Sequence, residues 1–237
     1  MTPELTIAQR PALTTAEKQR KDVVRISEIF HSIQGESSWA GRPCTFVRLT
    51  GCGLRCTYCD TEYAFYEGDD RSVAEVVEEA LSYGSPLVEL TGGEPLEQEA
   101  VYPLINAFLE RGIEVMLETG GHMDISRVDA RVRRIVDLKT PSSGMMKRNL
   151  LSNISELTQN DEVKFVIGSR ADYDWAVAMV REHALTERVP TVLFSPVAGA
   201  LAPNELARWI LEDRLPKAVR FQIQMHKVIW PATLRGV

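Results

Sequence analysis

Short apolar runs rich in β-branched residues alternate with longer amphipathic segments, and this alternation constrains the fold more than any other feature of the sequence. A capping box at Ser72 and Glu75 predicts a helix that stops at Gly84. Strand and helix in regular order imply an α/β fold whose mostly parallel sheet either curves into a barrel or is doubly wound. Strands are predicted over residues 23–30, 45–49, 87–90, 114–117, 135–138, 163–167, 191–194 and 219–224, and further helices over residues 98–111, 173–183 and 203–211.

Composition and charge limit the number of domains and the classes of partner. The chain has 237 residues, 44% of them hydrophobic, which suits one domain with a large core. Residues 1–22 lack sustained periodicity, so we expect a loosely ordered amino-terminal extension followed by a single core domain over residues 23–237. The net charge of -6 provides no positive field for a polyanion, so nucleic acid is not an expected partner. No stretch approaches about 18 apolar residues, so no membrane span is expected either.

Three cysteines, Cys52, Cys56 and Cys59, form a C-x3-C-x2-C loop directly after a predicted strand. A cluster of cysteines in a chain of this length indicates metal chemistry in a reducing compartment, so we expect a cytoplasmic protein. A structural zinc ion would need a fourth ligand, such as Cys44 or a histidine, and a non-enzymatic zinc-binding module therefore remains an alternative. A four-iron cluster held by three thiolates would leave one iron open to a ligand bearing an amine and a carboxylate. Cys44 lies within an apolar run and is expected to be a small buried residue outside the metal site.

The cysteine loop and the run Thr91-Gly-Gly-Glu-Pro95, which follows a later predicted strand, together resemble the radical S-adenosylmethionine (radical SAM) superfamily. The resemblance implies a partial (βα)6-type barrel, a [4Fe-4S] cluster on the three cysteines, and S-adenosylmethionine bound at the open iron. Glycines suit the run because only glycine lets the backbone approach the methionine moiety of S-adenosylmethionine so closely. The residues that the resemblance assigns to S-adenosylmethionine are Tyr58, Cys59, Asp60, Gly92, Gly93, Glu94, Glu118, Asp137, Leu138, Lys139, Ser195, Pro196 and Val197.

Four further segments, residues 28–36, 41–52, 59–61 and 224–227, resemble the 7-carboxy-7-deazaguanine synthases of 7-deazapurine (queuosine precursor) biosynthesis. That resemblance implies conversion of 6-carboxy-5,6,7,8-tetrahydropterin to 7-carboxy-7-deazaguanine with loss of ammonia. The chemistry would be carried by the cluster and a radical derived from S-adenosylmethionine, without a protein acid or base. Thr61 resembles the magnesium ligand of that family. The residues assigned to the pterin are Ile33, Gln34, Gly35, Glu36, Arg48, Thr91 and His226.

Several of these residues also have simpler interpretations. Arg48 could merely balance the charge of the cluster, Gln34 and Glu36 could be ordinary surface residues, and a lone histidine such as His226, late in a predicted strand, is more often structural. A glycyl-radical-enzyme activase would carry a similar cysteine loop and is the alternative enzyme.

Partners other than the pterin are expected from the fold and from local charge. The open edge of a partial barrel suggests a homodimer. A local basic set could serve an anionic substrate or an acidic electron donor such as flavodoxin, although we favour a solvated helix face for it. That set comprises Arg131, Arg133, Arg134, Lys139, Lys147 and Arg148.

Overall fold

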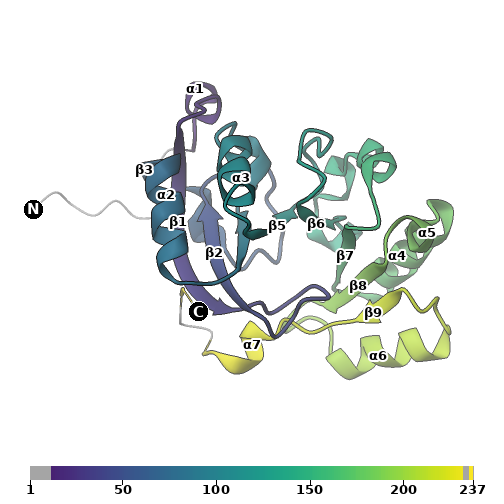
Figure 1. Ribbon diagram of the computed structural model, residues 1–237. Coiled ribbons are helices and arrows are strands. Elements are labelled where there is room, and N and C mark those ends of the chain that lie inside the picture. The colour runs from purple at the N-terminus through teal and green to yellow at the C-terminus, as the bar shows by residue number, and fades with distance from the viewer. Residues whose placement is uncertain (1–11, 232–234, 237) are drawn as a thin grey trace, which may run out of the picture.

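The structure is a computed structural model that describes residues 12–231 and 235–236. Within these residues, nine strands form one sheet in the order β3-β1-β2-β4-β5-β6-β7-β8-β9 (Figure 1). β1 is antiparallel to β2 and β3, whereas the neighbouring pairs from β2 to β9 are parallel. The predicted α/β fold with a mostly parallel sheet is therefore confirmed. The strands are β1 Val23–Ile33, β2 Pro43–Leu49, β3 Asp69–Ser72, β4 Leu87–Gly92, β5 Glu114–Thr119, β6 Arg133–Asp137, β7 Glu162–Ile167, β8 Thr191–Pro196 and β9 Val219–Phe221.

Helices α2, α3, α4 and α6 match the four predicted helices with shifted ends, whereas the short helices α1, α5 and α7 were not predicted. The capping box of α2 is present, since Glu75 N donates to Ser72 Oγ at 3.3 Å and Ser72 N donates to Glu75 Oε2 at 2.8 Å. A 3-10 turn over Pro95–Glu97 delays the start of α3. Within the described residues, no helix is both long and apolar enough to cross a membrane. The helices are α1 Thr15–Lys18, α2 Val73–Ser82, α3 Val101–Leu109, α4 Arg170–Glu182, α5 Leu185–Arg188, α6 Pro203–Glu212 and α7 His226–Ile229.

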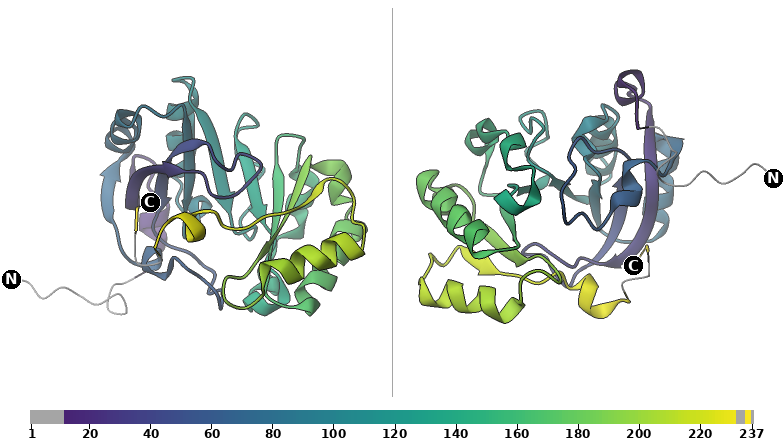
Figure 2. Two further views of the ribbon diagram at one scale, coloured as in Figure 1. Left: turned by 90° about the horizontal axis from the view of Figure 1, so that it is seen from below. Right: turned by 180° about the vertical axis from the view of Figure 1, so that it is seen from behind.

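The sheet curves into an incomplete barrel (Figure 2). The two faces of the sheet carry different side chains. Helices α2, α3, α4 and α6 pack on the outer face. Side chains alternate between the faces of a strand, so in β7 Phe165 and Ile167 join the core under the helices, while Lys164 and Val166 line the interior. The outer face therefore supplies stability, and the inner face is left for a ligand.

The segment before β1 packs against the domain from Leu13 onward, which differs from the loosely ordered extension expected up to residue 22. Thr14 and Glu17 form a capping box around α1. Lys18 forms an ion pair with Glu97 on the turn after β4, and Leu13 packs closely on the Gly51 backbone. The ion pair and the packing of Leu13 fix this short segment to the domain. Residues 1–11 lie outside the described residues.

The predicted solvated helix face among the basic residues is wrong. Arg133 and Arg134 lie in β6, near the middle of the sheet, and Arg134 is 4% exposed. The Arg134 guanidinium donates to both Asp161 carboxylate oxygens, from Nε at 2.8 Å and from Nη2 at 2.6 Å. Burial of a charge in a central strand is tolerated here because Asp161 neutralises it in a two-point hydrogen bond.

Replacement of Arg134 by methionine should lower the free energy of unfolding by about 3–5 kcal/mol, because the fully buried Asp161 would lose its counter-charge. Urea unfolding measures this change. Arg127→Met is the matched control, since Arg127 also binds a carboxylate at two points, that of Glu99, but is exposed, and should cost only about 0–1 kcal/mol. Equal losses in the two variants would contradict the assignment.

Candidate functional site

One cavity of about 940 Å³ lies inside the curved sheet, at the carboxyl ends of its parallel strands. Such strand ends are where ligands bind in parallel α/β folds. Most of the residues predicted from the sequence meet there. Those that line the cavity are Ile33, Gln34, Gly35, Glu36, Arg48, Cys52, Cys56, Tyr58, Cys59, Asp60, Thr61, Thr91, Gly92, Gly93, Glu118, Asp137, Lys139, Val197 and His226.

The three cysteines of the loop after β2 fit a cluster that is bound by thiolates. Cys52, Cys56 and Cys59 are free, partly exposed and on the wall of the same cavity. Burial raises the pKa of Cys52 to about 12, so binding of metal would displace the thiol proton. Cys44 is fully buried among Leu87, Met116 and Ile135, as expected for a residue outside the metal site.

The turn after β4 is fixed to the cysteine loop through the backbone. Gly93 N donates to Leu49 O at 3.0 Å, and Glu94 N donates to Gly51 O at 2.7 Å. A Cβ atom on Gly93 would lie closer than 3.0 Å to Gly51 O, and one on Gly92 would lie closer than 3.0 Å to Leu49 O. The glycines are thus required by contact between two protein segments, whereas the motif suggested a close approach to a ligand.

Glu94 is a correction to the predicted cofactor-binding set. Its carboxylate is fully buried, does not line the cavity, and accepts hydrogen bonds from the Thr119 hydroxyl, Gly120 N and Leu96 N at 2.8–3.1 Å. These donors come from the end of β5 and from the turn itself. The Glu94 side chain therefore holds the turn in place.

Three more residues assigned to S-adenosylmethionine are also outside the cavity lining. Leu138 packs in the core under the helices, because side chains alternate and its neighbours Asp137 and Lys139 face inward. Ser195 and Pro196 lie at the end of β8, and the chain first lines the cavity at Val197.

Arg48 lies beside an aromatic wall of the cavity. Its Nε donates to Glu28 Oε1 at 2.7 Å, and the Tyr63 hydroxyl donates to the same oxygen at 2.6 Å. The Arg48 guanidinium also lies 5.8 Å from the centre of the Phe30 ring. Among the described residues its two terminal nitrogens have no hydrogen-bond partner, so they are available to an anionic group in the cavity.

Glu89 and Lys164 are two ionisable residues of the cavity lining that were not predicted from the sequence. Each lies inside a strand between two apolar neighbours, and both are almost completely buried. Burial, reinforced by Glu118, raises the pKa of Glu89 to about 8. Burial opposes ionisation of Glu36, but Lys164 lowers the pKa of that carboxyl to about 2. A charged residue in a buried strand was the signal available in the sequence, because such residues are seldom buried without a partner.

The carboxyl-terminal segment closes one side of the cavity. His226 begins α7 rather than lying in a strand, and its Nδ1 would be 2.9 Å from a Cβ on Gly35. Lys227 pairs with Asp60 at 2.6 Å, and Arg235 pairs with Glu67 at 2.9 Å. The strand predicted over residues 219–224 ends at Phe221, and the chain then crosses the cavity.

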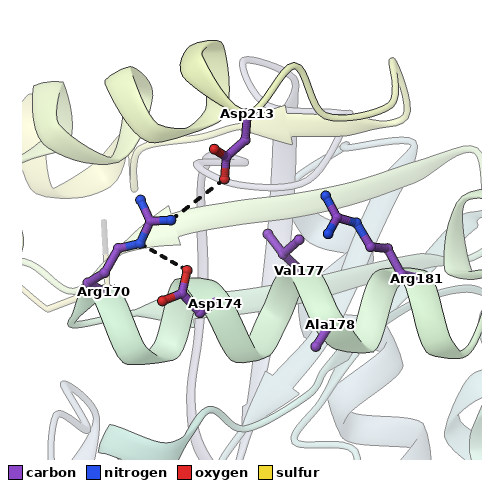
Figure 3. Close-up of a pocket in the computed structure, with 6 residues that line it drawn as sticks. All are labelled: Arg170, Asp174, Val177, Ala178, Arg181 and Asp213. Atoms are coloured by element: carbon purple, nitrogen blue, oxygen red, sulfur yellow. Dashed lines mark hydrogen bonds and ion pairs between the residues drawn. The ribbon is translucent and has the colours of Figure 1, made fainter.

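A second hollow, of about 400 Å³, lies on the surface between α4 and α6 (Figure 3). Arg170 is drawn there between two carboxylates, with Nε 2.9 Å from Asp174 Oδ1 and Nη2 3.8 Å from Asp213 Oδ2. It contains none of the predicted site residues.

Comparison with known proteins gives one consistent family. Residues 46–183 match the model of the radical SAM superfamily. The chain is 48% identical to a 7-carboxy-7-deazaguanine synthase of Chlorobaculum tepidum over 90% of this chain and 97% of that protein, and 43% identical to one of Koribacter versatilis over 90% and 100%. The fold is similar to the crystal structure of QueE from Escherichia coli, with a TM-score of 0.70 and 20% identity over 86% of this chain and 95% of that one.

Substitution of Gly93 by alanine should lower the iron and sulfide bound after anaerobic reconstitution several-fold, because the new methyl group would push the turn away from Gly51. Iron and acid-labile sulfide are assayed chemically. Gly112→Ala serves as the control: its φ of 73° makes alanine strained, but open space surrounds it and it does not line the cavity. Full cluster content in Gly93→Ala would contradict this role of the turn.

Glu89→Gln should make stability less dependent on pH. Since the pKa of Glu89 is raised from 4.5 to about 8, the folded protein retains a proton that the unfolded chain loses, and wild-type stability falls as the pH rises between these values. The glutamine variant lacks this loss. Urea midpoints at about pH 6 and pH 8.5 should therefore converge in the variant. If the urea midpoint changes by the same amount between these two pH values in both proteins, Glu89 is ionised in the folded state.

Proposed function

The chain belongs to the 7-carboxy-7-deazaguanine synthase family of the radical SAM superfamily, and on this basis we propose that it converts 6-carboxy-5,6,7,8-tetrahydropterin to 7-carboxy-7-deazaguanine with loss of ammonia. One observation carries the proposal: the three free thiols and the polar set of Gln34, Glu36 and Arg48 line a single cavity. Identity of 48% to a protein of that name supports this reaction over activation of a glycyl-radical enzyme.

In the proposed complex, Cys52, Cys56 and Cys59 hold the [4Fe-4S] cluster, and the turn at Gly92 and Gly93 contacts S-adenosylmethionine through its backbone. When both are bound, the cluster and S-adenosylmethionine together would supply the abstraction of a hydrogen atom from the substrate. A reaction of this kind requires a dry pocket. Two residues of the carboxyl-terminal segment, Trp230 and Pro231, line the cavity and would help to exclude water.

The remaining S-adenosylmethionine contacts are proposed for cavity residues around the cluster. Asp137 is the best supported, because its Oδ1 is buried and has no hydrogen-bond partner among the described residues, while its Oδ2 accepts from Lys139 Nζ at 2.8 Å. An unpaired carboxylate oxygen on a cavity wall suits a ligand that carries an ammonium or hydroxyl groups. The other residues in this proposal are Tyr58, Asp60 and Val197. Glu118 is left out of it, because its carboxylate contacts Lys164.

The substrate is proposed to lie on the wall of the cavity opposite the proposed S-adenosylmethionine contacts. The free nitrogens of Arg48 would bind its carboxylate, and Gln34 and Glu36 would pair with the donors and acceptors of its pyrimidinone ring. The rest of the proposed contact set is Ile33, Gly35, Thr91 and His226. No side chain is given the role of acid or base.

We also propose that Thr61 contributes to a Mg²⁺ site. Its hydroxyl is on the cavity wall, 3.8 Å from Cys59 Sγ. A single hydroxyl is a weak ligand, so substrate oxygens and water would complete the coordination, as Mg²⁺ commonly retains water.

Three broader expectations belong to the same proposal. A homodimer is supported by edge strand β9, near which Phe221 and Ile223 are exposed. An acidic electron donor such as flavodoxin would reduce the cluster. A reducing compartment such as the cytoplasm suits three free thiols.

The proposed reaction is tested with anaerobically reconstituted and reduced protein, S-adenosylmethionine and the carboxytetrahydropterin. Chromatography with mass detection should show 7-carboxy-7-deazaguanine and 5'-deoxyadenosine, with ammonia released. Formation of 5'-deoxyadenosine without the deazaguanine would reject this substrate while leaving membership of the superfamily intact.

Arg48→Met should raise the KM for the pterin about 10- to 100-fold, the loss expected when a charged group loses its hydrogen-bond partners. The reason is that the substrate carboxylate would face an apolar side chain. Arg42→Met is the control, because Arg42 forms an exposed ion pair with Glu114 outside the cavity lining. An unchanged KM in Arg48→Met would refute the role of Arg48.

A further inference from the structure

A single buried ammonium group joins several carboxylates of the cavity. Lys164 is 4% exposed, and its Nζ donates to Glu36 Oε2 at 2.9 Å and to Glu118 Oε1. Asp137 Oδ2 is 3.9 Å from the same nitrogen. Glu36 follows β1, whereas the other two carboxylates lie on β5 and β6, so Lys164 on β7 connects distant parts of the chain.

The hydrogen bonds continue from Lys164 to the residues proposed to bind the substrate. Glu36 Oε1 accepts from Gln224 Nε2 at 2.8 Å, and Glu36 N donates to the Gln34 amide oxygen. The Gln34 amide nitrogen in turn contacts Glu89. Both carboxylate oxygens of Glu36 are thereby fixed, and the orientation of the Gln34 amide is fixed as well.

Some acceptor capacity remains unused in this network. The second carboxylate oxygen of Glu118 has no hydrogen-bond partner among the described residues, and its side chain lines the cavity. Without Lys164, the carboxylates of Glu36 and Glu118 would repel each other and turn apart. With it, they stay side by side with acceptors directed toward a ligand.

We propose that Lys164 is a positioning residue that holds Glu36 and Glu118 together so that their carboxylates jointly receive the N–H donors of an aminopyrimidinone ring. This inference rests on the proposed function, because it assumes that the pterin ring occupies this wall. It assigns Lys164 no contact with the substrate carboxylate and no part in binding S-adenosylmethionine, since Asp137 keeps its closer partner, Lys139.

The test compares Lys164→Met with Arg133→Met in the reconstituted enzyme. Arg133 is the matched control, because it pairs at 3.3 Å with Glu162, which is fully buried and lies two residues before Lys164 in β7. Neither Arg133 nor Glu162 lines the cavity. We expect Lys164→Met to raise the KM for the pterin at least tenfold while the Kd of S-adenosylmethionine changes less than twofold. Compared with the wild-type enzyme, Lys164→Met should form more 5'-deoxyadenosine for each molecule of 7-carboxy-7-deazaguanine. Arg133→Met should lower the unfolding midpoint without changing the KM.

Lys164→Met could destabilise the fold by leaving carboxylates without a counter-charge. The double variant Lys164→Met/Glu118→Gln removes one of these charges, and it should recover stability but keep the raised KM. Wild-type turnover with an unchanged KM in both Lys164 variants overturns this inference alone. Wild-type protein that neither binds nor converts the pterin overturns the proposed function, and this inference with it.

Discussion

The site depends on a contact between two stretches of backbone, the turn at Gly92–Glu94 and the chain that leaves β2 at Leu49. Two hydrogen bonds and two positions without a side chain bring these segments together, and the three thiols lie on one of them. The carboxylate of Glu94 then ties the turn to the end of β5. The motif therefore has a structural role that does not depend on any ligand.

The inner face of the sheet carries charges that an ordinary core would exclude. Burial of ionised groups is costly unless they pair, and a network that is only partly paired is worse than an apolar wall. Lys164 and Lys139 satisfy part of the negative charge around them, whereas one oxygen of Asp137 remains unpaired among the described residues. A cavity of this kind is better suited to binding a polar ligand than to stabilising the fold.

Local pattern predicted all strands of the sheet except β3, whereas most of the predicted cavity residues came from the resemblance to a known family. Runs of β-branched residues marked the strands, and residues at strand ends were expected to meet. Lys164 and Glu36 are 128 residues apart, so no local sequence pattern could predict their ion pair. Leu138 and Glu94 were assigned to a ligand by their place in a motif, whereas alternation and burial direct them into the protein. Arg134 was misplaced because the basic residues around it suggested a surface helix, and its buried partner Asp161 is distant in sequence.

Because Cys44 is separated from the other cysteines, labelling of the thiols can measure how much of the protein carries a cluster. Cys44 is completely enclosed, while the three cavity thiols are open to small molecules. A maleimide dye applied to the folded chain would label the cavity thiols when iron is missing, with Cys52 the slowest because burial raises its pKa, and none of them when a cluster covers the sulfurs. The fourth cysteine would stay unlabelled in both states, so the dye count would follow occupancy without a background to subtract.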